Sequence, residues 1–172
     1  EIGNMGATGM QSSFFEDMVA EVLALTGEDS SVKVRRVLRN SCMLSSDVSA
    51  AYDPLYPEVF EKKNTAYFGR GLVLNKYTGS RGKNGTSDAN AEYVAKVRNV
   101  FDNNHVAFQT AELGKVDQGG GGTIAYVMAN KAMSVIDSGV AVLSMHAPYE
   151  VTSKSDIYEV YRGYKAFLKD MK

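Results

Sequence analysis

The chain has 172 residues, of which 44% are apolar and 23% charged, a composition typical of a folded domain with one sizeable core. Its formal net charge is −1 and its lysines and arginines are scattered, so the basic surface of a nucleic-acid-binding protein is missing. No run approaches the ~20 apolar residues of a membrane span and no secretory signal pattern is present, so we expect no membrane partner. The lone Cys42, expected in the core, excludes an internal disulfide and fits a reducing, cytoplasmic compartment.

In the first half of the chain, apolar spacing and turn residues predict alternating helices and strands. A helix is predicted over residues 13–25, where apolar side chains recur at helical spacing, namely Phe14, Met18, Val22 and Leu25. Gly27 ends this helix, and a short amphipathic segment follows over 31–41. The stretch "CMLSSDVS", residues 42–49, has the pattern of a buried strand and leads into a loop punctuated by proline. The next predicted strand is "RGLVLNKYTG", residues 70–79.

The second half of the chain continues the alternation. A helix is predicted over 88–102, a strand over 105–113, and a further helix after four consecutive glycines. One or two strands are predicted in "SVIDSGVAVLSMH", residues 134–146. The last predicted helix begins at Ser153 or Ser155 and carries an apolar stripe, comprising Ile157, Val160, Tyr161, Tyr164, Phe167 and Leu168. The alternation predicts a layered α/β fold with helices on both faces of a sheet.

The glycine run in "KVDQGGGGTIAYVMANK", residues 115–131, raises the question of a phosphate-binding loop. A P-loop requires a lysine and a serine or threonine directly after its last glycine, because the ammonium group contacts the phosphates. Here Thr123 is followed by Ile124, and the next lysine is Lys131. The dinucleotide-binding pattern of glycines is not met either. A nucleotide site is therefore kept only as an alternative, and bare glycine backbone also suits a place where a substrate or another chain passes close.

Three polar residues lie at positions where α/β folds place their functional sites. Asp47 and His146 each end a predicted strand, and Glu1 comes directly before a glycine-rich turn. A single carboxylate of this kind is usually a turn residue, and a single buried histidine is usually a packed core residue. Together they supply carboxylate and imidazole donors, which zinc accepts. The sequence has no G-x-S-x-G elbow and no recognisable cysteine–histidine pair. Neither a serine hydrolase nor a cysteine hydrolase is therefore indicated. A metal site is the resulting hypothesis.

Four blocks of the sequence, in this order, resemble a known family. They are "EIGNMGATGMQSSFF", "LSSDVSAAYDPLYPE", "GKVDQGGGGTIA" and "VLSMHAPYEVTSKSD". The chain is similar over essentially its whole length to the C-terminal part of aspartyl aminopeptidase-like zinc metallopeptidases, especially the bacterial branch. The resemblance implies a three-layer α/β/α fold of the phosphorylase/hydrolase-like kind, with a mixed sheet. It also implies that residues 1–172 are the C-terminal portion of a single catalytic domain whose upstream part lies outside this chain.

The resemblance also implies a set of site residues. Glu1, Asp47 and His146 match metal ligands of a centre with two zinc ions, and cobalt or manganese would accept the same donors. No catalytic residue is expected within the chain, because the general-base glutamate of the family comes just before Glu1. We therefore expect the full-length protein to be a metalloaminopeptidase that hydrolyses peptides by metal-activated water, and these 172 residues alone to be inactive.

Substrate-binding residues are expected around the glycine run. The resemblance makes it a loop along which the peptide lies, with Gly120, Gly121, Gly122 and Thr123 at the substrate and Asp117 orienting the loop. Recognition of an acidic N-terminal residue requires a cation, and the family uses a lysine near the strand predicted here over 70–79. The candidate is Lys76, with Arg81 or Lys83 of the adjacent loop as alternatives. The expected substrate is accordingly a peptide that begins with aspartate or glutamate.

Assembly and two competing functions complete the expectations. The family forms closed homo-oligomers, typically dodecamers, so a homo-oligomer that includes the upstream part of the same protein is expected. One alternative is a catalytically inactive, peptidase-like scaffold, which would lack a glutamate before Glu1. The other is a nucleotide-binding domain, which would bind phosphate at residues 119–122 and no zinc.

Overall fold

A four-stranded mixed sheet forms the centre of the computed structural model, which describes residues 5–80 and 87–172. The strand order is β1-β7-β3-β5, with bounds Cys42–Ser45, Ser134–Gly139, Leu72–Asn75 and Phe108–Thr110. β1 runs parallel to β7 and β3 runs parallel to β5, whereas β3 and β7 are antiparallel. The predicted mixed sheet is confirmed, and its longest strand, β7, lies in the interior.

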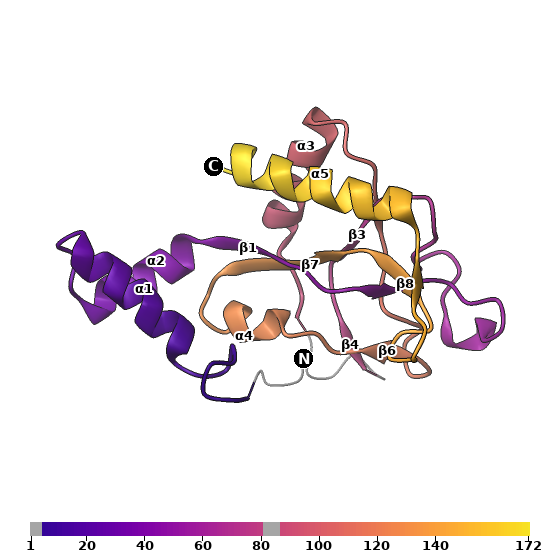
Figure 1. Cartoon of the computed structure of the whole chain (residues 1–172), viewed down its shortest axis with the longest axis horizontal. Coiled ribbons are helices and arrows are strands. Elements are labelled where there is room, and N and C mark those ends of the chain that lie inside the picture. Colours follow the sequence, from indigo (N-terminus) through magenta and orange to yellow (C-terminus); the bar gives the residue numbers. More distant parts are fainter. Residues whose placement is uncertain (1–4, 81–86) are drawn as a thin grey trace.

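Helices cover both faces of this sheet, so the fold has three layers (Figure 1). One face carries α3 and α5, whose bounds are Ala91–Asn103 and Lys154–Asp170. The other face carries the short α4, Ala125–Ala129, and a separate apolar cluster that includes Leu38 of α2. The helices α1 and α2, with bounds Phe14–Leu25 and Ser31–Asn40, lie beyond the sheet edge at the far end of β1 (Figure 1). Within the described ranges, none of the helices combines the length and hydrophobicity needed to cross a bilayer.

Two short ladders extend the structure towards one end of the sheet. A three-stranded ladder has the order β2-β8-β9, with bounds Ser49–Ala50, Ala141–Leu143 and Val151–Thr152. A two-stranded ladder joins β4 and β6, which are Gly79–Ser80 and Gly120–Gly121. A single 3-10 turn, Pro57–Val59, lies in the proline-punctuated loop. These short elements carry the candidate functional residues described below.

The single strand predicted over 42–49 is divided in two. The chain bends after Ser45, where the Asp47 N–H donates to the Ser45 carbonyl over 3.0 Å and pairing with β7 ends. The Asp47 carboxylate then accepts a hydrogen bond of 2.8 Å from the Val48 N–H. Local carboxylate bonds of this kind favour a turn over an extended strand. The bend moves the chain from the main sheet to the β2–β8 ladder and leaves Asp47 between the two.

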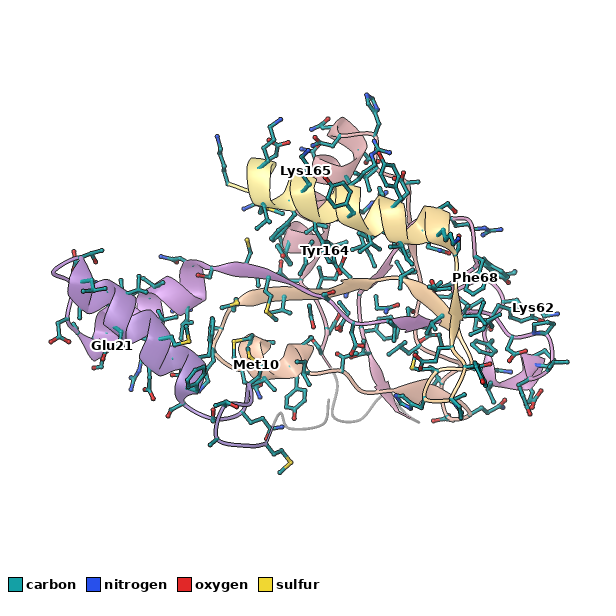
Figure 2. All side chains as sticks on the ribbon, viewed as in Figure 1. Met10, Glu21, Lys62, Phe68, Tyr164 and Lys165 are labelled. Atoms are coloured by element: carbon teal, nitrogen blue, oxygen red, sulfur yellow. The ribbon has the colours of Figure 1, made fainter. Side chains whose placement is uncertain are left out.

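The predicted apolar stripe of α5 is only half buried. Val160, Tyr164 and Phe167 pack on the core between α5, α3 and the sheet. Ile157, Tyr161 and Leu168 remain exposed, because the contact with the sheet is narrower than the stripe predicted from spacing. Figure 2 shows Tyr164 pointing from α5 towards the sheet and Lys165 pointing away. The Tyr164 hydroxyl lies 2.5 Å from the Ser138 carbonyl, so the helix is also tied to β7 by a polar contact.

The helix predicted at 13–25 forms, but its spaced apolar residues face outward. Phe14, Met18, Val22 and Leu25 are all exposed, and α1 contains no buried residue. The adjacent face carries Phe15 and Val19, which pack against the cluster around α4. Cys42, expected in the core, is exposed at the start of β1. Helical spacing therefore predicted the element correctly, while the packing of the domain selected another face of it.

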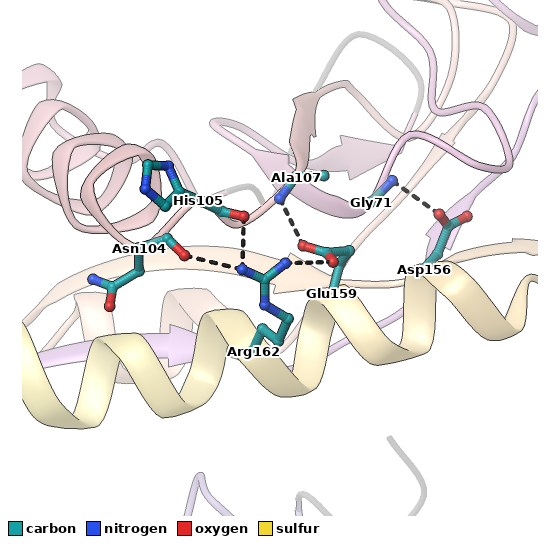
Figure 3. A network of polar contacts seen from close by, with 7 residues as sticks. All are labelled: Gly71, Asn104, His105, Ala107, Asp156, Glu159 and Arg162. Carbon is teal, nitrogen blue, oxygen red and sulfur yellow. Dashed lines mark hydrogen bonds and ion pairs between the residues drawn. The ribbon is translucent and has the colours of Figure 1, made fainter.

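Acidic and basic groups at i, i+3 and i+6 fasten α5 to the loops beside it (Figure 3). The Arg162 guanidinium pairs with Glu159 over 2.8 Å and donates to the carbonyls of Asn104 and His105. Glu159 in turn accepts a 2.7 Å hydrogen bond from the Ala107 N–H. At the start of the helix, Asp156 accepts from backbone N–H groups in the turn before β3. This row fixes α5 across the sheet and thereby the orientation of β3.

Candidate functional site

Two candidate ligands that are far apart in sequence lie in one pocket. Asp47 precedes β2 and His146 follows β8, and these two strands pair in parallel. Both residues line a pocket of about 780 Å³, together with Thr123 and the glycines at 120–122. Its remaining walls are apolar or small, namely Val48, Ala50, Leu113 and Met145. The fold therefore brings together six residues that the sequence singled out.

The backbone of Asp47 packs directly against Gly139, the last residue of β7. A Cβ atom at Gly139 would lie 1.5 Å from the Asp47 carbonyl oxygen and 2.6 Å from its carbon. No side chain fits there, so glycine is required by this close approach and not by its backbone angles. Next to this contact, the Ser49 N–H donates to the Val140 carbonyl over 2.9 Å. The position of the Asp47 backbone relative to the sheet is thus set by a glycine on the neighbouring strand.

His146 lies in a tight turn after β8. Its φ is +69°, and that of Ser144, two residues earlier, is +56°. Such angles are uncommon for residues with a side chain and are found where neighbouring structure enforces them, often at functional sites. The His146 N–H donates to the Glu150 carboxylate over 2.5 Å, and the Ala147 N–H donates to the Ser144 carbonyl. The turn brings the exposed His146 to the rim of the pocket.

The four glycines serve two different ends. Gly119 passes so close to the Val59 carbonyl that a Cβ would lie 2.5 Å from its oxygen, and Gly120 has a φ of +105°. The chain therefore needs glycine at both positions. At Gly121 and Gly122, in contrast, a Cβ would meet nothing within 4 Å. These two leave open space at the pocket, where a bound molecule can approach the backbone.

Behind the glycine run lies a buried carboxylate that sequence reasoning missed. Asp137, in the middle of β7, is 2% exposed, and its Oδ2 accepts a hydrogen bond of 2.9 Å from the Thr123 hydroxyl. Burial raises the pKa of Asp137 to about 6, and the negative charge of Asp47 adds to this, whereas the hydrogen bond from Thr123 opposes it. The available signal was an aspartate inside the apolar strand "SVIDSGVAV".

The other predicted site residues lie elsewhere. The Lys76 ammonium is paired with Asp88 at 2.5 Å, and Lys76 is not among the residues that line the pocket. Asp117 is exposed, has a φ of +67°, and lies outside the pocket lining as well. Glu1, Arg81 and Lys83 fall outside the described residues, so their predicted roles stay predictions. The glycine run forms β6 and does not lead directly into a helix, because α4 begins only at Ala125.

The two candidate donors in the pocket, Asp47 and His146, suit zinc chemically, but two ligands do not make a complete site. Carboxylate oxygen and imidazole nitrogen are ordinary zinc ligands, and a protein zinc site needs three or four. Over residues 5–80 and 87–172, no group of three or more histidine, cysteine, aspartate or glutamate side chains is placed to hold a metal ion. Asp47 and His146 can therefore form part of a centre that further ligands must complete.

The chain is thus a three-layer α/β domain whose pocket combines a carboxylate, a histidine and a glycine run at the ends of strands. The family model described as aminopeptidase I zinc metalloprotease (M18) matches residues 1–168. The chain belongs to this family, and the expected resemblance is confirmed.

Relatives and solved structures support the same assignment. A probable M18 family aminopeptidase 1 of Clostridium acetobutylicum is 61% identical over 99% of this chain. The crystal structure of an M18 aminopeptidase from Thermotoga maritima is 45% identical and matches 97% of this chain with a TM-score of 0.92. The S. cerevisiae mApe1 dodecamer, at 23% identity and a TM-score of 0.73, shares the fold. The chain spans only 37% of the length of the first of these relatives and 37% of the Thermotoga chain.

Proposed function

We propose that this chain is the C-terminal part of a metallopeptidase catalytic domain that removes N-terminal residues from peptides. One observation carries the proposal: Asp47 and His146, separated by almost one hundred residues, line the same pocket as the glycine run. Membership of a family described as zinc metalloproteases supports the metal and the reaction class. The length of the relatives supports the view that further parts of the site lie outside these residues.

In this proposal the carboxylate of Asp47 and the imidazole of His146 hold zinc, with Glu1 as a third ligand and two ions in the complete site. Zinc, when bound, polarises a peptide carbonyl and lowers the pKa of water. The general base is the residue before Glu1. The open backbone at Gly121 and Gly122 admits the peptide, and its N–H groups bind the peptide chain.

The test is replacement of Asp47 or His146 by alanine in the full-length protein. We expect bound zinc to fall and kcat/KM for peptides to drop more than about 100-fold, because even outer-shell changes at metal sites cost about 10- to 100-fold. His105→Ala is the matched control, since His105 is an exposed histidine with a similarly positive φ of 52° outside this pocket. Zinc loading is measured by elemental analysis and activity by amino-acid release.

Two results would contradict this function. A wild-type protein that binds zinc but hydrolyses no peptide points to the inactive scaffold. If variants at Asp47 and His146 keep both bound zinc and activity, these residues are not part of the metal site. Chelation of the wild-type protein followed by zinc addition should abolish and then restore hydrolysis.

The preference for acidic N-terminal residues is a further part of the proposal. Lys76 is the candidate cation, and its present partner Asp88 would have to release it. In the full-length enzyme, Lys76→Ala is expected to raise KM for peptides that begin with aspartate or glutamate, with peptides that begin with leucine as the control. An unchanged KM for both peptide classes would move the role to the adjacent loop, to Arg81 or Lys83.

We also propose that the full-length protein is a cytoplasmic homo-oligomer, with a dodecamer as the expected assembly. The proposal draws on the family's expected assembly and on the dodecameric state of the fold relative mApe1. Sedimentation of the full-length protein measures the assembly directly, and a monomer at working concentration would contradict it.

A further inference from the structure

Asp137 occupies a position in the sheet where an ionisable group is costly. It lies in β7 opposite Ser45 on one side and Asn75 on the other, with strands on both sides and 2% of its surface exposed. A carboxylate in such a place requires hydrogen bonds to offset the loss of water. Its partner on the side of the pocket is Thr123, whose hydroxyl donates to Asp137 Oδ2 over 2.9 Å.

Thr123 is the first residue after the glycines that carries a side chain. Residues 119–122 have none, so nothing but backbone contacts can fix them directly. The Thr123 Oγ1 also accepts a hydrogen bond of 3.4 Å from the Ala125 N–H and lies 3.5 Å from the Thr78 Oγ1. One buried hydroxyl thus connects the end of the glycine run to α4 and to the central strand of the sheet.

We propose that Asp137 is a positioning residue: through the Thr123 hydroxyl it holds the glycine run at the pocket and so sets peptide affinity. The affinity part rests on the function proposed above. A hydrogen bond to an ionised carboxylate is stronger than one between neutral groups, which suits it to hold a segment of low intrinsic order. The open faces of Gly121 and Gly122 then stay directed at the bound peptide.

The competing explanation is that the bond only satisfies a buried aspartate and contributes to folding. That role would lower the melting temperature and the fraction of correctly folded protein, but it would leave KM and the local dynamics of the glycine run unchanged. The two explanations therefore differ in readouts other than total activity.

The first measurement is amide hydrogen exchange of residues 119–123 in the full-length protein. Thr123→Val has nearly the same shape and lacks the hydroxyl, and exchange in this segment is expected to accelerate about tenfold, the equivalent of one strong hydrogen bond. Thr123→Ser keeps the hydroxyl and should exchange as the wild type does. Unchanged exchange in the valine variant, or equal acceleration in both variants, overturns the proposal.

The second measurement is steady-state kinetics with a peptide substrate, with kcat expressed per bound zinc. Thr123→Val is expected to raise KM about tenfold with kcat per zinc close to wild type, and Thr123→Ser to restore KM. If exchange accelerates but KM does not change, the glycine run is no substrate element and the positioning role is refuted. If the wild type hydrolyses no peptide while exchange behaves as expected, the proposed function fails and the link itself stands.

Variants at Asp137 test the other end of the link. Asp137→Asn keeps an oxygen that can accept from Thr123 but removes the charge, so its KM should lie between those of the wild type and Thr123→Val. Asp137→Leu removes the acceptor and should match Thr123→Val. The double variant Thr123→Val/Asp137→Leu should be no worse in KM than either single variant, because both remove one interaction. If Asp137→Leu does not fold, the valine and serine variants of Thr123 decide the question alone.

Discussion

Asp156→Ala is expected to lower the free energy of unfolding by about 2–4 kcal/mol, as is typical when a buried acceptor is removed and its backbone donors are left unsatisfied. The Asp156 carboxylate is 1% exposed and accepts from Gly69 N–H over 2.8 Å and from Gly71 N–H over 2.9 Å. Alanine would leave both donors without their acceptor. The negative charge is also favoured at the N-terminus of α5, next to the capping Ser153. The measurement is chemical denaturation of the full-length protein, followed by circular dichroism.

The turn at Gly71 explains why no simple rearrangement compensates for this loss. Its φ is +85°, and a Cβ would lie 2.0 Å from the Ala107 carbonyl oxygen, to which the Leu72 N–H also donates. Lys165→Ala is the matched control, because Lys165 lies on the same helix and points away from the sheet (Figure 2). A denaturation midpoint for Asp156→Ala equal to that of Lys165→Ala would show that the hydrogen bonds from Gly69 and Gly71 to Asp156 contribute nothing to stability.

The second large effect is expected for Gly139→Ala. We expect this substitution to lower the free energy of unfolding by at least about 3 kcal/mol and to reduce zinc binding. The added methyl group would overlap the Asp47 carbonyl, where the nearest distance is 1.5 Å and the atoms concerned are backbone. Relief requires the bend between β1 and β2 to move away from β7, which breaks the hydrogen bond from Ser49 N–H to the Val140 carbonyl. Asp47 would move with the bend and away from its place at the pocket.

The control for Gly139→Ala is Ser138→Ala, one residue earlier in the same strand. The Ser138 hydroxyl is buried and makes no hydrogen bond within the described part of the chain, so its removal should change the midpoint little. Denaturation and zinc content are measured for both variants. A Gly139→Ala protein with the wild-type midpoint and full zinc content would sink the idea that this glycine sets the position of Asp47.

The sequence predicted part of the candidate site, and the missing parts share one physical reason. Asp47 and His146 follow apolar strands, and the glycines stand out by composition, so each could be found locally. Asp137 and Gly139 matter because of what lies on the neighbouring strand or loop, Thr123 in one case and the Asp47 backbone in the other. Contacts between residues distant in sequence leave no periodic pattern in either segment.

The sequence by itself determined the helices, the strands of the central sheet and their order, because helical and strand periodicity and capping residues such as Ser153 act over a few neighbouring residues. Only the tertiary structure decided which faces are buried. It exposes Phe14, Met18, Val22 and Leu25 on α1, since burial depends on what the rest of the chain places beside a helix. It also divided the strand at Asp47 and brought that residue and His146 to one pocket through the parallel pairing of β2 with β8. The site is formed by strand pairing and close backbone packing between segments that are distant in sequence, and no local spacing of residues encodes either of these.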